Sequence, residues 1–274
     1  MAATETFRPN VRGADFRAIV YNAAKDGNLA RLRIFLEGHN EEFLDECLNG
    51  GIVKSAIVIA SRNGHLAIVR YLLAKGANAL QVGTVSFDGE TIHDAPPLWA
   101  AAAAGHMEVV RCLVDEAKVS INQTTATNSS PLRGACYDGH LQIVKFLVEH
   151  GAELELANRH GHTPLMIASF RKKTQVVQYL LQQKANPSAT SLKGNTALHD
   201  AAEADSKEVC ELLLQNGARL MKDDTGVSPL MGAAMLANMQ IDRCFSLWMH
   251  ACTLQQRYDC YGKDAYEFIR ESWV

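Results

Sequence analysis

A pattern of about 33 residues recurs along the chain and constrains its fold more than any other feature. Its clearest copy is Ser129–Leu154, a turn, a short helix, a tight turn, a longer helix and a glycine stop. Ser130 can cap the first helix, and Pro131 suits the first turn, where a missing N–H costs nothing. Asp138–His140 forms the turn between the helices, and Gly151 ends the second helix. Neither helix is long enough to be stable alone, so the unit needs neighbouring copies.

The second helix of this unit carries a regular apolar face. Leu141, Val144, Leu147 and Val148 recur at the spacing of three, four and seven residues that is typical of a helix with one apolar side. We therefore expect these four side chains to face the core of the protein.

Further copies precede and follow this unit. They lie at Ser61–Ala77, Pro97–Arg111, His162–Leu181 and Thr196–Ala218. Pro131 to Pro164 and Pro164 to Ala197 are each about 33 residues apart, which is the ankyrin period, and Thr196–His199 is a variant of the ankyrin T-P-L-H signature. The sequence therefore predicts an all-α ankyrin-repeat solenoid of about six to seven helix-turn-helix repeats with a terminal helical cap.

We expect residues 1–14 to form a flexible arm and residues 15–237 to form the ankyrin array. The insertion at 80–95 lengthens one repeat by about eight residues. Its Val82, Val85 and Phe87 around glycines predict an extended, hairpin-like finger, and insertions of this kind are often on the binding face of repeat proteins.

The ankyrin pattern stops after Val227–Ala234, which starts a seventh unit. Residues 238–274 are expected to hold a C-terminal helix and tail, with the amphipathic stripe in Ile241–Gln256. An improvised cap of the solenoid is the favoured interpretation of this helix, and a partner-binding helix is the alternative.

Composition narrows the class of protein. The formal net charge of −3 gives no general attraction to nucleic acid or to an anionic membrane. The 7 cysteines form no C-x-x-C pair and fit a reducing compartment, and Cys112, Cys136 and Cys210 fall on repeat helices where a small buried residue is wanted. No apolar run approaches membrane-spanning length. We expect a soluble cytoplasmic or nuclear protein with no cofactor and with neither nucleic acid nor a membrane as a partner.

Histidines and carboxylates give no sign of catalysis. His65, His106 and His140 fall in the Gly-His turns, where ankyrin repeats use the imidazole to bind neighbouring loop backbone. Zinc binding by His160 and His162 would need further ligands that the sequence does not supply. The chain has no Walker loop, G-x-S-x-G, H-E-x-x-H or kinase motif, so we predict that it is not an enzyme.

Several loop sequences go beyond a generic ankyrin repeat and closely resemble the Fem (feminization) family. They are Ser86–His106, Thr127–Glu153, Ala157–Ser169 and Lys193–Glu203. Met221–Ala234 looks most like the nematode member, and Ile241–Gln256 is similar to a tetratricopeptide-type helix of the family.

The resemblance implies a substrate receptor of a cullin-RING ubiquitin ligase. Members of the family hold C-terminal degrons, often ending near arginine, and in nematodes the family acts in sex determination. The family chain continues to an elongin- and cullin-binding box, which cannot be identified in this sequence. A short paralogue, a fragment and a faulty gene model all stay open as explanations.

The concave side of an ankyrin array, lined by turn fingers and inner helices, is the expected binding surface. The candidate peptide-binding residues there are Phe87, Asp88, Trp99, Ser129, Tyr137, Asp138, Phe170 and Asp200. Carboxylates pair with an arginine guanidinium and aromatic faces stack on it. In the resemblance, Asp88 and Asp138 match degron-binding acids of the family and Ser129 matches a nearby hydrogen-bonding residue.

Each of these candidates also has a structural interpretation. Asp138 could be a turn residue that bonds its own backbone, Asp88 could be a turn residue before Gly89, and Trp99 could be a core residue. Two hypotheses for the whole chain stay open. It selects proteins for ubiquitination, or it is an ankyrin scaffold or competitor that binds partner proteins without docking to a ligase.

Overall fold

The computed structural model describes residues 13–37 and 54–235. The chain divides into two compact units, Met1–Ala126 and Thr127–Val274. Most of the expected N-terminal arm and all of the expected C-terminal helix and tail lie outside the described residues.

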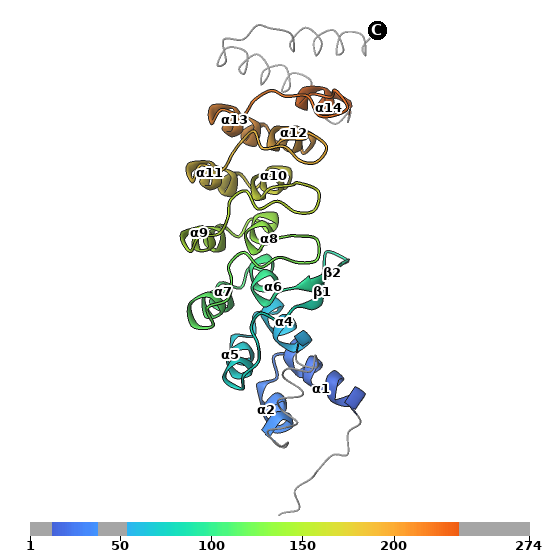
Figure 1. Cartoon of the computed structure of the whole chain (residues 1–274), viewed down its shortest axis with the longest axis vertical. Helices are drawn as coiled ribbons and strands as arrows, with labels where there is room; N and C mark the ends of the chain where they lie inside the picture. The colour runs from blue at the N-terminus through green and yellow to red at the C-terminus, as the bar shows by residue number, and fades with distance from the viewer. Residues whose placement is uncertain (1–12, 38–53, 236–274) are drawn as a thin grey trace, which may run out of the picture. The chain divides into compact units, whose positions relative to one another are not determined.

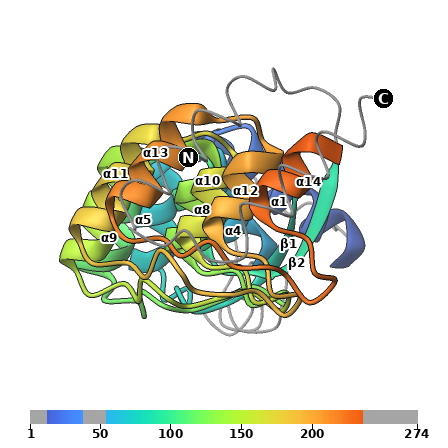
Figure 2. The ribbon, with the colours of Figure 1, turned by 90° about the horizontal axis from the view of Figure 1, so that it is seen from above.

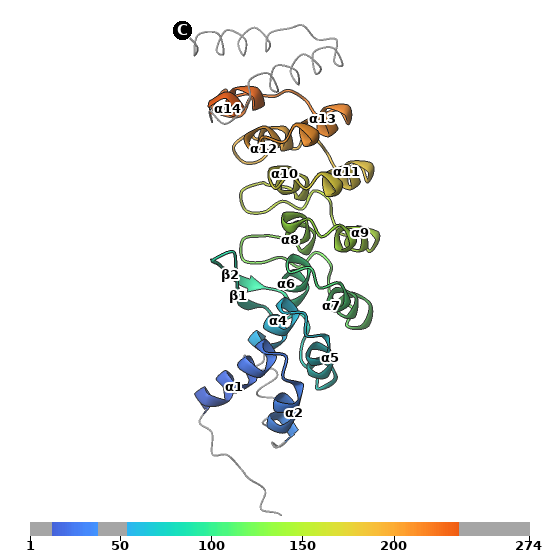
Figure 3. The same ribbon diagram turned by 180° about the vertical axis from the view of Figure 1, so that it is seen from behind.

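The described residues of the first unit form three helix pairs and one hairpin. The pairs are α1 (Gly13–Lys25) with α2 (Leu29–Glu37), α4 (Lys54–Arg62) with α5 (Leu66–Ala74), and α6 (Pro97–Ala103) with α7 (Met107–Arg111), which continues into the π-helical turn η1 (Cys112–Glu116). Between the second and third pairs lies the antiparallel hairpin of β1 (Gly83–Phe87) and β2 (Glu90–Ala95). In Figures 1 and 3, α4 and α6 lie beside the hairpin, and α5 and α7 lie on the other side.

The second unit repeats the same arrangement, and no hairpin occurs between residues 127 and 235. Its pairs are α8 (Pro131–Asp138) with α9 (Leu141–Glu149), α10 (Pro164–Phe170) with α11 (Thr174–Gln182), and α12 (Ala197–Glu203) with α13 (Lys207–Gln215), followed by α14 (Pro229–Met235). Figure 2 shows α9, α11 and α13 as one layer and α8, α10 and α12 as the other. The fold is therefore the predicted all-α ankyrin solenoid, with α14 where a seventh unit was expected to start.

Local sequence accounts for the start of the inner helices α8 and α10. Ser130 Oγ accepts a hydrogen bond from the Arg133 backbone N–H at 3.2 Å, and Pro131 occupies the first turn of α8, as predicted. Thr163 caps α10 in the same way through the Met166 backbone N–H. These caps satisfy amide groups that the first turn of a helix otherwise leaves without partners.

Small residues let neighbouring inner helices approach one another. All seven residues of α6, PLWAAAA, are buried, as are Ala56–Ala60 of α4. In α9 the buried residues are Ile143, Val144, Phe146 and Leu147, whereas Leu141 is half-buried. The expected stripe was therefore right at Val144 and Leu147 and wrong at Leu141 and Val148, which is also half-buried. The stripe is shifted by about a quarter of a turn, because α9 contacts both its own inner helix α8 and the adjacent outer helix α11.

Hydrogen bonds between consecutive fingers tie the repeats together. In the second unit, Arg159 N–H donates to the Thr127 carbonyl at 2.9 Å and Leu192 N–H donates to the His160 carbonyl at 3.0 Å. In the first unit, Ala126 N–H donates to the His93 carbonyl of β2 at 3.1 Å. These bonds keep each finger in register with the next.

The turns between paired helices also stack. His65 Nε2 lies 2.9 Å from the Lys25 carbonyl oxygen, which confirms the backbone-binding role expected for this histidine. At the turn after α10, Lys172 adopts a φ of 55°, and the corresponding residue of the preceding repeat, Gly139, has a φ of 84°. Lys173 then takes the place of the histidine, because its methylene groups lie against Gly139. The Arg171–Lys173 segment therefore preserves the turn although its sequence departs from the pattern.

The positive φ at this turn predicts that Lys172→Gly stabilises the protein. A side chain in the left-handed region costs roughly 1–2 kcal/mol, and glycine avoids most of that cost. We expect the free energy of unfolding to rise by about 1 kcal/mol in urea denaturation. Gly139→Ala is the matched control and should lower stability, since its Cβ would lie 2.8 Å from Lys173 Cδ. A loss of stability in Lys172→Gly would contradict this explanation of the turn.

Candidate functional site

In the first unit, the hairpin presents Phe87 and Asp88 at its tip. Asp88 and Gly89 form a two-residue turn in which both have positive φ, 49° and 81°, and the Asp88 side chain is exposed. Two positive φ angles are typical of the tight turns that match the twist of a hairpin. Asp88 therefore has the turn role considered for it, and its exposed carboxylate stays available to a ligand.

Trp99 lies beneath this tip and is largely buried. The rings of Phe87 and Trp99 meet edge to face, with centroids 5.4 Å apart, and only 6% of Trp99 is exposed. Arg62 of α4 covers Phe87, with its guanidinium carbon 4.7 Å from the ring centroid. Arg62 Nε also donates to the Ser86 carbonyl at 2.8 Å. Trp99 thus supports the hairpin from the core and offers little surface of its own.

In the second unit, Arg133 and Tyr137 are four residues apart on α8 and therefore share one face, and Ser129 lies just before the helix. Ser129 is 3% exposed, and its Oγ accepts a hydrogen bond from Arg133 Nη1 at 3.3 Å. The Nε atom of Arg133 is buried and has no hydrogen-bond partner among the described residues. A buried donor without a partner costs about 1–3 kcal/mol, so this N–H is ready to bind an acceptor.

Asp200 of α12 lies close enough to Arg133 for the two charges to affect each other. Burial and, to a smaller extent, the charge of Glu203 together raise the pKa of Asp200 to about 7, although Arg133 acts in the opposite direction. Burial also lowers the pKa of Arg133 from its ordinary value, and burial with the charge of Arg133 lowers the pKa of His162. The predicted residue Asp200 is therefore a buried carboxyl near a cation, and is only 8% exposed.

Tyr137 and Asp138 contact an arginine of the next repeat. The guanidinium carbon of Arg171 lies 4.2 Å from the Tyr137 ring centroid, and Arg171 Nη2 lies 3.9 Å from Asp138 Oδ1. Phe170, one residue earlier, is 43% exposed. The structure thus brings Tyr137 and Asp138 together around a guanidinium, the chemical group that these residues were expected to bind.

Of the sequence candidates, Ser129, Tyr137, Asp138, Phe170 and Asp200 lie in the second unit, and Phe87, Asp88 and Trp99 in the first. Arg133 was missed. It occupies the third position of α8, where the signature has histidine and where α12 has His199, so a long cation at that position was an available signal.

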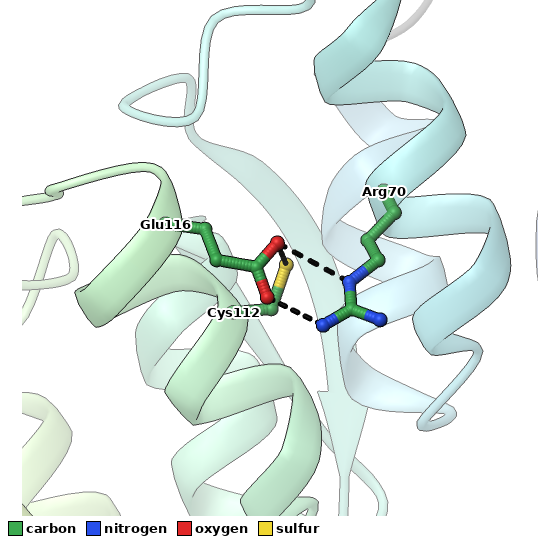
Figure 4. A network of polar contacts seen from close by, with 3 residues as sticks. All are labelled: Arg70, Cys112 and Glu116. Atoms are coloured by element: carbon green, nitrogen blue, oxygen red, sulfur yellow. Dashed lines mark hydrogen bonds and ion pairs between the residues drawn. The ribbon is translucent and has the colours of Figure 1, made fainter.

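A cavity of about 560 Å³ lies elsewhere in the first unit, at the ends of the outer helices. Its wall includes Arg70 and Glu116, which pair as shown in Figure 4, with Arg70 Nε donating to Glu116 Oε2 at 3.2 Å. Arg70 lowers the pKa of Glu116, and burial raises the pKa of the neighbouring Cys112 thiol. None of the candidate peptide-binding residues lines this cavity.

Neither a metal site nor a membrane-spanning helix occurs among the described residues. No group of three or more histidine, cysteine, aspartate or glutamate side chains is arranged to hold a metal ion there. No helix in the same part of the chain is long and apolar enough to cross a membrane.

Comparison with known proteins agrees with this architecture. The family model for ankyrin repeats, described as three copies, matches residues 20–125, 98–191, 154–224 and 169–247. The chain therefore belongs to the ankyrin-repeat family, whose members are protein-binding repeat scaffolds.

The relatives define the branch of that family. "Sex-determining protein fem-1" of Caenorhabditis elegans is 58% identical over 226 residues, which is 81% of this chain and 34% of the relative. "Protein fem-1 homolog CG6966" of Drosophila melanogaster is 50% identical over 113 residues, 40% of this chain and 17% of the relative. "Protein fem-1 homolog A" of Homo sapiens is 50% identical over 153 residues, which is 54% of this chain and 23% of the relative. The predicted Fem relationship is confirmed, and the chain spans about a third or less of the length of these relatives.

The raised pKa of Asp200 predicts a pH-dependent stability. Between the ordinary value of 3.8 and about 7 the folded state holds a proton that the unfolded state has released, so stability falls as pH rises through this window. We expect the stability of the wild type relative to Asp200→Asn to fall by about 2 kcal/mol from pH 5 to pH 8 in urea denaturation. Glu203→Gln should shrink this change, because it removes one cause of the raised pKa. A difference that does not vary with pH would contradict the burial of Asp200.

Proposed function

We propose that this protein binds the C-terminal segments of partner proteins, with a terminal arginine as the preferred residue. The observation that carries the proposal is the pair of opposite binding groups on α8. Arg133 has a buried N–H without a partner, and Asp138 with Tyr137 forms a place for a guanidinium. A terminal arginine carries both complementary groups on one residue.

The spacing of these two groups also fits. Arg133 and Tyr137 are four positions apart on one face of α8, which corresponds to about 6 Å of rise along the helix, and Asp138 follows Tyr137 directly. An extended arginine residue, from its carboxylate to its guanidinium, spans a similar distance. The carboxylate would accept hydrogen bonds from Arg133 and Ser129, and the guanidinium would lie between Asp138 and Tyr137.

Energetics favour moderate affinity. A hydrogen bond to a charged group contributes about 1.5–3 kcal/mol, and two of them with some aromatic burial approach the −8 kcal/mol of a micromolar complex. Within the first unit, Asp88 and Phe87 are proposed as a separate peptide contact, since the Fem resemblance matches Asp88 to a degron-binding acid. Phe170, which is 43% exposed, is proposed as an apolar contact of the second-unit site.

The wider role rests on the Fem relationship. We propose that binding of this kind selects proteins for a cullin-RING ubiquitin ligase, in a process such as sex determination, which the nematode relative's name states for that relative. The alternative is an ankyrin scaffold or competitor that binds the same segments without a ligase. Recovery of elongin and cullin in a pull-down would support the first role, and their absence would support the second.

Fluorescence polarisation with labelled ten-residue peptides tests the binding proposal. We expect a peptide ending in arginine to bind, and both a lysine-ended and an amidated arginine-ended peptide to bind more weakly. Asp138→Ala should weaken the arginine-ended peptide about tenfold or more, since tenfold corresponds to 1.4 kcal/mol. Glu149→Ala, a change on α9 outside the candidate site, is the control. Equal binding of all three peptides, or unchanged affinity in Asp138→Ala, would contradict the proposed site.

A further inference from the structure

Two arginines of this chain already lie on the aromatic rings next to the candidate acids. Phe87-Asp88-Gly89 and Tyr137-Asp138-Gly139 are the same aromatic-Asp-Gly sequence in the two units. Arg62 stacks on Phe87 and Arg171 stacks on Tyr137, at 4.7 Å and 4.2 Å from the ring centroids. Each arginine therefore offers to its ring the group that an arginine-ended ligand would bring.

The two arginines differ in how firmly they are held. Arg62 donates hydrogen bonds to the Ser86 carbonyl at 2.8 Å and to Asn63 Oδ1 at 3.2 Å. Arg171 reaches Asp138 only at 3.9 Å, which is beyond hydrogen-bond distance. The side chains of Arg171 and Asp138 are each 36% exposed, and exposed ion pairs of this kind are weak. Arg62 is thus part of the hairpin's support, whereas Arg171 is held loosely.

We infer that Arg171 is an internal competitor at the second-unit site, where it mimics the ligand's guanidinium. It occupies the face of Tyr137 and the carboxylate of Asp138 in the absence of a ligand, so an incoming arginine must displace it. This inference rests on the proposed function.

Displacement of Arg171 has a free-energy cost, and ligands offset this cost to different extents through their own contacts. A ligand arginine can replace both contacts of Arg171, because a guanidinium both stacks on a ring and pairs with a carboxylate in a fork. A ligand lysine is a compact point charge that replaces the stacking poorly. Arg171 therefore lowers the affinity for every ligand that must displace it, by the same factor, and the ligands that still bind are those whose own contacts exceed this cost, as those of a terminal arginine do.

Replacement of Arg171 tests the inference with the same labelled arginine-ended peptide. We expect Arg171→Gln, which keeps length and removes the charge, to bind about three- to tenfold more tightly than the wild type. Arg171→Lys should be intermediate, because it keeps the charge and loses the fork and part of the stacking. The lysine-ended peptide should gain by a similar factor, because it must displace the same Arg171 side chain.

Lys172→Asn is the matched control. It removes the same charge one residue away, and asparagine tolerates the positive φ of 55° at this position. We expect less than a twofold gain in affinity. An equal gain in Lys172→Asn and Arg171→Gln would show a general charge effect and overturn the inference.

The remaining outcomes separate this inference from the proposed function. Wild-type binding with unchanged or weaker binding by Arg171→Gln overturns the inference and leaves the peptide site intact. Binding that appears only in Arg171→Gln supports both. No binding by the wild type or by any variant contradicts the proposed function and this inference with it.

Discussion

Every helix pair in this protein is too short to be stable by itself, so each is stabilised by the pairs stacked against it. The alanine-rich faces of α4 and α6 and the apolar stripes of the outer helices make this stacking possible within each unit. Hydrogen bonds from finger to finger then fix the register, as between Arg159 and Thr127. Within this regular frame, one position of the inner helices, the third, holds different residue types in different repeats.

The third position of the inner helices shows how the frame is used. His199 accepts a hydrogen bond from the Thr196 backbone N–H, and the Met166 sulfur accepts one from the Thr163 N–H, so both stabilise their own helix starts. Trp99 supports the hairpin from the same position of α6. Arg133 carries only hydrogen-bond donors, so it cannot accept a bond from the helix start as His199 and Met166 do. Its buried Nε is the group proposed to bind a ligand. One structural position therefore serves capping, packing and proposed recognition in different repeats.

Sequence patterns predicted the elements well, because spacing, caps and turn residues act locally. The Ser130 cap, the His65 turn and the extended finger at 80–95 were all expected from a few adjacent residues. The burial of Ile143 and Phe146 was missed because it depends on adjacent outer helices. Arg171 over Tyr137 could not be predicted, since the two are 34 positions apart in consecutive repeats and meet only through stacking. The peptide-binding role of the candidate residues is still a prediction.

Arg133 is proposed to bind the carboxylate at the C-terminus of a peptide. A double-mutant cycle measures this interaction directly. The dissociation constants of free-acid and amidated arginine-ended peptides would be measured for the wild type and for Arg133→Gln. If Arg133 contacts the carboxylate, the two changes should couple by about 1 kcal/mol or more, because either one removes the same interaction. Additive losses, with a coupling below about 0.3 kcal/mol, would contradict the account and place the carboxylate elsewhere.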